Sequence, residues 1–206
     1  MSITLSCAPR QCAHVAAALI VILFAKPLIF AWTGKEVLAD RASLIAALLT
    51  SGSAVNCLLI FPYALQLAYG WTRLAIWSNV LALCISAPLL LVFTRYFGAA
   101  GAASVWLIVN LSYIATNVVP MHRRLLAFEA KRWFFEDVGI PLIACTVSAV
   151  LLFERADYSS TRLTAGLTVS FAAIVLGSVG FLATPLTRRR FRMLIARKLR
   201  VSSVSA

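Results

Sequence analysis

The sequence predicts an all-α integral membrane protein with about six transmembrane helices. Of its 206 residues, 62% are hydrophobic and only 13% are charged, a balance too apolar for a water-soluble domain of this size. The apolar stretches run for about 20 residues without interruption, which is the length of a helix that crosses a bilayer. They lack the short alternating pattern of a membrane β-barrel. Because lipid offers the backbone no hydrogen-bond partners, we expect α-helices, which make all their backbone hydrogen bonds within one segment.

Hydrophobicity divides the chain into a cytoplasmic leader (1–12), a six-helix transmembrane lobe (13–185) and a basic cytoplasmic tail (186–206). Within the lobe, charges, Gly and Pro separate six segments at roughly 13–33, 42–69, 72–94, 99–121, 138–154 and 163–185. The first segment resembles a signal peptide, but Lys26 interrupts it and no small-residue cleavage site follows before Trp32, so a retained helix is expected. Residues 34–41 form a short polar turn, and the connections at 69–71 and 95–99 are tight enough to make antiparallel neighbours of the helices they join.

Lysine and arginine predict the orientation, because these residues concentrate on the cytoplasmic side of a membrane protein. With the N-terminus in the cytoplasm, 13 of the 19 basic residues lie on the cytoplasmic side and five on the other, and Lys26 remains inside the first segment. Both termini are then cytoplasmic. The charge of +12 gathers beside hydrophobic segments, where anionic headgroups are the expected partner, and nucleic acid is not. The tail suits either a short helix on the inner leaflet or a solvated stop-transfer segment.

No covalent chemistry or cofactor is predicted. The five cysteines are odd in number and scattered, so they suggest neither disulfides nor a metal site. The few acids and histidines do not cluster as a membrane enzyme would require, and we interpret them as interfacial anchors; those considered were His14, His122, Glu129, Glu136 and Asp137.

Polar residues inside the segments are the candidate binding residues, because each one costs free energy in hydrocarbon unless it faces a cavity or a partner helix. Lys26 is the foremost, although its flexible stem also allows its amine to reach the headgroups. Asn56, Tyr63 and Gln66 share one face of the second segment. The fourth segment repeats the pattern, with Trp106 followed by a second stripe of Asn110, Tyr113 and Asn117. Such stripes serve either as interhelical hydrogen-bond contacts or as a ligand site, and Asn79 is a weaker candidate.

The order of several short motifs resembles the polysaccharide and O-antigen flippases of the multidrug/oligosaccharidyl-lipid/polysaccharide exporter superfamily. The resemblance covers roughly residues 20–145, as judged from segment order and helix spacing. It rests on Trp32-Thr33-Gly34, Asn56, Phe61-Pro62-Tyr63, the run 65–70, Asn79, Pro88, the run 96–103, Trp106, Asn110, the run 121–126 and the run 132–141.

This resemblance implies one lobe of a two-lobed transporter that moves an undecaprenyl-diphosphate-linked oligosaccharide across the bacterial inner membrane for lipopolysaccharide biosynthesis. The matches fall on the carboxy-terminal lobe, so an amino-terminal lobe or a homodimer partner is expected, because alternating access needs two bundles. In this reading Lys26 meets the diphosphate or a sugar acid, and Asn56, Tyr63 and Gln66 line the cavity.

Other readings remain open at this stage. The chain is alternatively a truncated, non-transporting remnant or a scaffold subunit of polysaccharide assembly. A membrane-embedded transferase would require converging acids or histidines. A multidrug antiporter of the same superfamily would more readily carry intramembrane Asp or Glu, whereas every acid here is expected at or outside a segment end.

Overall fold

The computed structural model describes residues 14, 16–120, 139–155 and 161–182, and within them every regular element is a helix. The helices are α2 (Ala25–Thr33), α3 (Glu36–Ala68), α4 (Thr72–Tyr113), the π-helix η1 (Ile114–Val118), α7 (Ile140–Arg155) and α8 (Arg162–Leu182). Residues Ala16–Leu23 form a further helical segment before α2. The predicted leader, the basic tail and most of the basic connection after the fourth segment lie outside the described residues.

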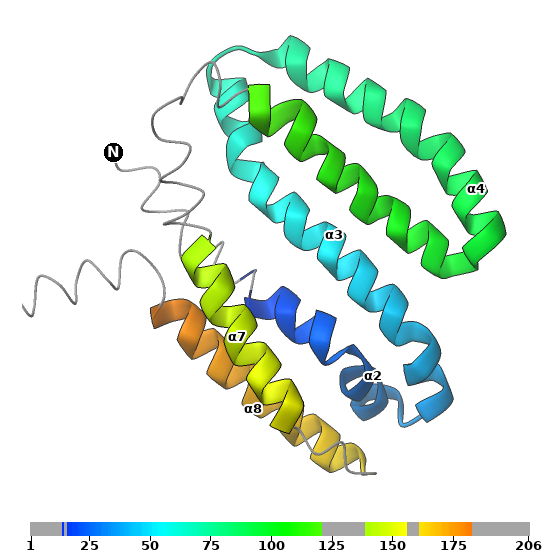
Figure 1. The fold of residues 1–206 in the computed structure, drawn as a ribbon, viewed down its shortest axis with the longest axis vertical. Coiled ribbons are helices and arrows are strands. Elements are labelled where there is room, and N and C mark those ends of the chain that lie inside the picture. Colours follow the sequence, from blue (N-terminus) through cyan, green and yellow to red (C-terminus); the bar gives the residue numbers. More distant parts are fainter. Residues whose placement is uncertain (1–13, 15, 121–138, 156–160, 183–206) are drawn as a thin grey trace, which may run out of the picture.

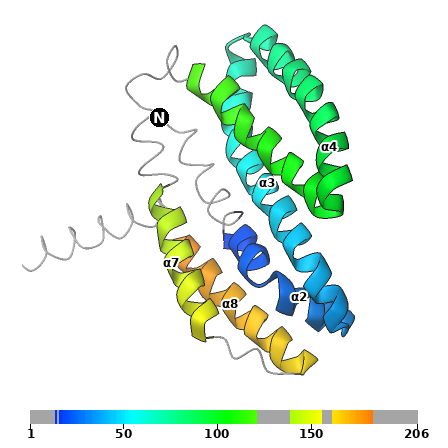
Figure 2. The ribbon, with the colours of Figure 1, turned by 45° about the vertical axis from the view of Figure 1, so that its right-hand side comes forward.

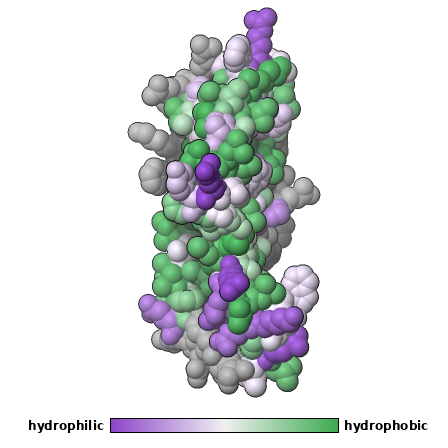
Figure 3. Space-filling view, turned by 90° about the vertical axis from the view of Figure 1, so that its right-hand side faces the viewer, coloured by the Kyte–Doolittle hydropathy of each residue, from purple (hydrophilic) through white to green (hydrophobic). Residues whose placement is uncertain are grey.

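Three described helices are long and apolar enough to cross a membrane: Glu36–Ala68, Thr72–Val118 and Arg162–Gly180. The bent pair Ala16–Leu23 and Ala25–Thr33 would provide a fourth span if the two pieces cross together, and the apolar helix Leu142–Glu154 is shorter. The outer surface matches this composition, since hydrophobic residues dominate the face in Figure 3 and hydrophilic residues form separate patches on it. The all-helical, apolar character that the composition predicts is therefore confirmed for these residues.

Helix α3 is the long central element of the molecule (Figure 1). Its 33 residues extend for about 50 Å at the α-helical rise of 1.5 Å per residue. It contacts α4 and η1 along one part of its length and α2 along another, while α8 packs against α2 and α7 packs against α8 (Figure 2). The helix begins at Glu36, six residues before the predicted segment, so Asp40 and Arg41 belong to its first turns.

Helix α4 consists of two arms that meet at Gly98, where the backbone takes φ 60° and ψ −140°. A positive φ of this kind is open to glycine at little cost and to few other residues. The first arm, 72–97, follows α3 through the turn at Tyr69 and Gly70, where the amide of Trp71 donates to the carbonyl of Gln66 at 2.9 Å. The two tight connections predicted from the sequence are thus confirmed, and α3 runs parallel to the second arm of α4 (Figure 1).

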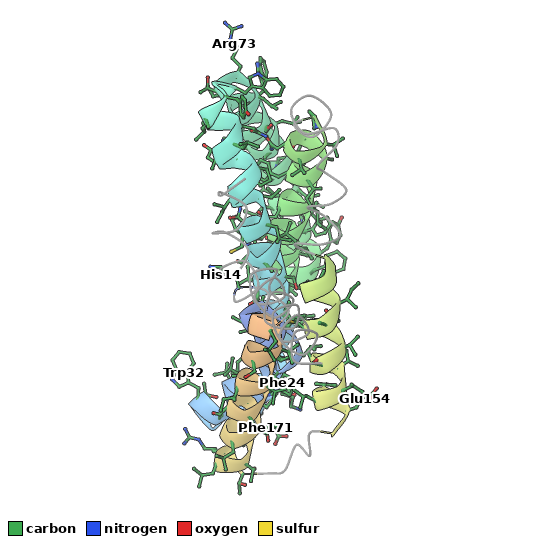
Figure 4. All side chains as sticks on the ribbon, turned by 90° about the vertical axis from the view of Figure 1, so that its left-hand side faces the viewer. His14, Phe24, Trp32, Arg73, Glu154 and Phe171 are labelled. Carbon is green, nitrogen blue, oxygen red and sulfur yellow. The ribbon has the colours of Figure 1, made fainter. Side chains whose placement is uncertain are left out.

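The predicted first segment, 13–33, is wrong as a single helix, because the chain bends by 76° between Ala16–Leu23 and Ala25–Thr33. Pro27 gives the reason: it has no amide hydrogen, and its ring conflicts with the carbonyl of Leu23, four residues earlier. Phe24 occupies the bend and is fully buried, with its ring edge-on to Phe153 at 5.9 Å between centroids. Figure 4 shows Phe24 within the molecule, with Trp32 to one side of it and Glu154 to the other.

The apolar core lies where the first helical pieces meet α7 and α8. Its buried members are apolar side chains, mostly small ones around Phe24 and Leu176: Ala16, Phe24, Cys145, Ala149, Val169, Ala172 and Leu176. At the outer end of this group, the guanidinium of Arg162 donates to the carbonyls of Ala31 and Trp32, at 3.3 and 3.0 Å. Because those carbonyls belong to the last turn of α2, Arg162 caps that helix from the start of α8.

The interface between α3 and α4 is built differently, from small and polar side chains. The buried residues of α4 include Ala75, Ser78, Ala82, Gly101, Ala103 and Asn110. A Cβ atom at Gly52 would overlap the ring of Trp106, and one at Gly101 would overlap the backbone carbonyl of Phe93. Small residues therefore allow the helices to approach closely at Gly52 and Gly101.

Replacement of Gly101 by alanine should destabilise the α4 hairpin, because the added methyl group would overlap rigid backbone at Phe93. A cost of about 1–3 kcal/mol is expected for overpacking of this kind. Gly177→Ala is the matched control, since nothing lies within 4 Å of a Cβ atom there. Unfolding of both variants in mixed micelles, followed by far-ultraviolet circular dichroism, measures the difference. Equal stability of the two variants would contradict the close approach.

Candidate functional site

The two polar stripes predicted on separate segments meet between α3 and the second arm of α4. The side-chain amide of Asn56 donates to Oδ1 of Asn110 at 2.8 Å. Asn110 is fully buried, and its own Nδ2 donates to the backbone carbonyl of Trp106 at 2.8 Å. Above this pair, the indole N–H of Trp106 reaches the hydroxyl of Ser53 at 3.4 Å. The stripes therefore hold the two helices in one register.

The first arm of α4 completes the polar contacts. The hydroxyl of Tyr113 donates to Oδ1 of Asn79 at 2.9 Å, and the hydroxyl of Ser78 lies 2.9 Å from Oδ1 of Asn117. Asn79 was a weak sequence candidate and Ser78 was not one. A signal for both existed, because Ala75, Ser78, Asn79 and Ala82 recur at helical spacing as a face of small and polar residues.

A cavity of about 400 Å³ opens beside these contacts, between α3 and the two arms of α4. Its wall is made of amides, aromatic rings and aliphatic side chains: Asn56, Leu59, Ile60, Pro62, Tyr63, Ala75, Asn79, Trp106, Val109, Asn110, Tyr113 and Asn117. None of these side chains carries a charge. The site thus offers hydrogen bonds from several amides together with flat apolar ring surfaces, inside a volume typical of a small-ligand pocket. We call it the amide cavity.

Five of the seven predicted binding residues line the amide cavity: Asn56, Tyr63, Asn110, Tyr113 and Asn117. Gln66 does not line it. Its side chain is fully buried beside η1, where Nε2 donates to the backbone carbonyl of Asn117 at 3.3 Å. The structure thus places Gln66 in the interface between α3 and η1, and its predicted part in substrate binding stays a prediction.

Lys26 is also separate from the amide cavity. It lines a second cavity, of about 600 Å³, together with residues such as Glu36, Ser43, Phe153 and Thr168. Its amine forms an ion pair with Asp40 at 2.6 Å, and both side chains are about half exposed, at 54% and 53%. Lys26 and the stripe of Asn56 and Tyr63 thus border different cavities, because the bend at Phe24 directs α2 toward the first turns of α3.

The described residues contain no group of three or more His, Cys, Asp or Glu side chains that could hold a metal ion. His14 is exposed, and the other histidine and the acids at 129, 136 and 137 fall outside the described residues. Comparison of the chain with protein-family models, with curated proteins and with solved structures gave no match. The geometry of the two cavities therefore carries the functional argument.

The Asn56–Asn110 hydrogen bond should be measurable as a coupling energy between the two side chains. In a double-mutant cycle with Asn56→Ala and Asn110→Ala, a coupling of about 0.6 kcal/mol is expected, with about 1.7 kcal/mol as the upper end for membrane proteins. Asn56→Ala paired with Ser86→Ala is the control, because Ser86 is exposed and its hydroxyl donates to the carbonyl of Leu83 in its own helix. That pair should be additive. Zero coupling in the Asn pair would contradict the contact.

The ion pair of Lys26 with Asp40 predicts a rescue by charge exchange. Lys26→Asp places two acids together and Asp40→Lys places two bases together, so each single variant should lower the thermal unfolding midpoint in detergent. The double variant restores opposite charges at the same distance and should recover most of that loss. If the double variant is no better than the worse single variant, the two side chains do not interact as the structure places them.

Proposed function

We propose that this chain is one six-helix lobe of a transporter that moves a lipid-linked oligosaccharide across the bacterial inner membrane. The observation that carries the proposal is the amide cavity, an uncharged pocket with four asparagine side chains, two tyrosines and a tryptophan among apolar helices. Amides donate and accept hydrogen bonds and therefore pair with sugar hydroxyls of varied stereochemistry. Flat rings supply apolar contact to the carbon faces of a sugar.

The arrangement of the helices supports a membrane-spanning lobe. The reversal at Gly98 divides α4 into two arms, so the bent first pair, α3, both arms, α7 and α8 correspond to the six segments that hydrophobicity defines. Arg73, assigned to the cytoplasmic side, lies at one end of the molecule, and Trp32 and Glu154 lie toward the other (Figure 4). The same orientation assigns both termini to the cytoplasm by the 13 to 5 division of basic residues.

A single lobe of this kind would not by itself form a transport pathway, because alternating access requires two bundles that rock around a shared site. We therefore propose that the amide cavity forms half of a pathway, completed by an amino-terminal lobe or by a second copy of the chain. The large apolar side chains exposed on α4, among them Ile76, Trp77 and Leu91, suit contact with lipid or with such a partner.

The second cavity, which Lys26 and Glu36 line and which we call the charged cavity, has a separate part in this proposal. Lys26 would exchange its carboxylate partner, Asp40, for the diphosphate or a sugar acid of the substrate, which keeps the amine paired throughout. In a restored transporter Lys26→Ala should therefore lower flux while Lys26→Arg retains most of it. Lys35→Ala is the control, since Lys35 precedes α3 and does not line that cavity. Unchanged flux in both Lys26 variants would remove Lys26 from substrate binding.

Complementation tests the proposal directly. The chain is expressed in a flippase-null strain alone, with a matching amino-terminal lobe, and joined to that lobe as one polypeptide. Surface polysaccharide should return in at least one of the three, because the proposed pathway needs both bundles. If none restores it while the proteins are present in the membrane, the transport proposal fails, and the reading as a remnant or scaffold subunit of polysaccharide assembly takes its place.

Substitution in the amide cavity should then reduce the restored flux. Tyr63→Leu removes a ring that contacts the cavity, and loss of one aromatic contact of about 1.4 kcal/mol lowers flux roughly tenfold. Tyr69→Leu is the matched control, since Tyr69 is exposed just beyond α3 and does not line the cavity. Equal flux in the two variants, at equal protein levels, would show that transport does not depend on the amide cavity.

A further inference from the structure

The charged cavity combines charged side chains with an apolar wall. Lys26 and Glu36 are exposed, and Asp40, which pairs with Lys26 at 2.6 Å, is about half exposed. Most of the wall is apolar, with Ile22, Leu23, Phe30, Leu44 and Ala47 among its residues. The volume of about 600 Å³ is in the range of small-ligand pockets. The cavity therefore suits an amphiphile, a molecule with a charged end and an apolar end.

The charged side chains lie toward one end of the molecule. Lys26 belongs to the same short helix as Trp32, which is 85% exposed and lies toward that end (Figure 4). Exposed tryptophan is typical of the boundary between lipid headgroups and hydrocarbon. Ile22 and Leu23 precede the bend at Phe24, so the apolar wall continues on the other side of the bend. A bilayer lipid has this arrangement, with its charges at the boundary and its chains beyond it.

Negative charge exceeds positive charge at this site. Lys26 carries one positive charge, whereas Glu36 and Asp40 carry two negative charges. These two acids are four residues apart on α3, so they share one helical face, with about 5–6 Å between their Cβ atoms. Asp40 is paired with Lys26, but Glu36 has no ion pair among the described residues. One carboxylate is therefore left for a cationic group of a ligand.

Two hydroxyl groups in the wall add further acceptors. Oγ of Ser43 donates to the carbonyl of Asp40 at 3.1 Å, and Oγ1 of Thr168 donates to the carbonyl of Thr164 at 2.8 Å. Because a hydroxyl has a single proton, both oxygens offer a ligand only lone pairs. The amine of Lys26 has three N–H bonds, and Oδ1 of Asp40 takes one of them. The site thus combines one donor group with several acceptors.

We propose that the charged cavity binds a bilayer phospholipid with a primary ammonium headgroup, of the phosphatidylethanolamine type. Its phosphate would accept a hydrogen bond from a remaining N–H of Lys26, without loss of the ion pair to Asp40. Its ammonium group would donate to Glu36, the carboxylate without an ion pair. Its acyl chains would cover the apolar wall, which removes that surface from water at the membrane boundary.

The charge balance separates this headgroup from two others. Phosphatidylglycerol carries a phosphate but no ammonium group, so its net negative charge would meet the surplus carboxylate of Glu36. Phosphatidylcholine carries a positive charge, but its quaternary nitrogen has no hydrogen to donate to an acceptor. Only the primary ammonium headgroup supplies a phosphate for Lys26 and a charged donor for Glu36.

Lipid binding does not rest on the proposed transport function. If the chain also transports a lipid-linked oligosaccharide, the diphosphate of that substrate would compete with the lipid phosphate for the amine of Lys26. This competition alone rests on the proposed function.

Headgroup selectivity is tested on the full chain, purified and delipidated in detergent, with no glycan and no partner lobe. Failure here therefore stays distinct from failure of the transport proposal. Phosphatidylethanolamine, phosphatidylcholine and phosphatidylglycerol with identical acyl chains are added in equal amounts, and native mass spectrometry measures which lipid stays bound. Wild type should retain phosphatidylethanolamine about tenfold over each of the others, the ratio expected of one charge-assisted hydrogen bond.

Substitution of each charged side chain should change the selectivity in its own way. Glu36→Gln removes the surplus carboxylate, so the preference over phosphatidylglycerol should fall by about tenfold. Lys26→Met removes the donor to the phosphate and should weaken retention of phosphatidylethanolamine by about tenfold. Glu154→Gln is the matched control for Glu36→Gln, because Glu154 is an exposed acid that does not line the cavity. It should retain the wild-type preference.

Circular dichroism identifies variants that do not fold. Glu36→Gln keeps the size of the side chain and leaves the Lys26–Asp40 ion pair in place, so it carries the test if Lys26→Met does not fold. Equal retention of the three lipids by folded wild type would overturn the proposal and assign the cavity to surrounding lipid without headgroup recognition. An unchanged preference in folded Glu36→Gln would overturn it as well.

Discussion

The hydrogen bond between Asn56 and Asn110 is the contact on which the α3–α4 half of the structure depends. Asn110 is fully buried, so loss of its partners would leave an amide unsatisfied among apolar side chains. A shift of α3 along the second arm by one turn would separate the pair. Gly52 fixes the same register from the side, because only a residue without Cβ admits the ring of Trp106 there. The amide cavity lies next to both contacts, and its shape follows from this register.

Pro27 has a comparable effect on the other half. By ending the first helical piece at Leu23, it turns α2 across the start of α3, and the turn places Lys26 beside Asp40. Arg162 then holds the far end of α2 through the carbonyls of Ala31 and Trp32. One imino acid thus decides that the charged cavity and the amide cavity are separate, although both border α3.

Sequence reasoning was strongest where a single local rule decides the structure. Gly70 and Gly98 lie in the two predicted tight connections, where positive φ favours glycine, and the helical repeat placed Asn56 and Asn110 each in a polar stripe of its own segment. Sequence reasoning was weaker where tertiary contacts decide the ends of a helix or the position of a side chain. Hydrophobicity alone did not extend α3 to Glu36, since Asp40 and Arg41 look like a polar turn until Lys26 pairs with one of them. The position of Gln66 depended on the turn of α3 against η1, and no sequence pattern reports that contact.

The Asn56–Asn110 pair and the Gln66 side chain differ in how fully their polar atoms are paired. At Asn56 and Asn110, each of the two side-chain amide groups donates to one acceptor, the balance expected of a contact that holds helices together. At Gln66, by contrast, Nε2 donates to the carbonyl of Asn117, but Oε1 has no donor among the described residues. If Gln66 served packing alone, an apolar side chain in its place would satisfy the interface better, because it would remove the unpaired oxygen. Gln66 therefore gains the interface little stability, and packing between α3 and η1 does not by itself explain a glutamine at this position.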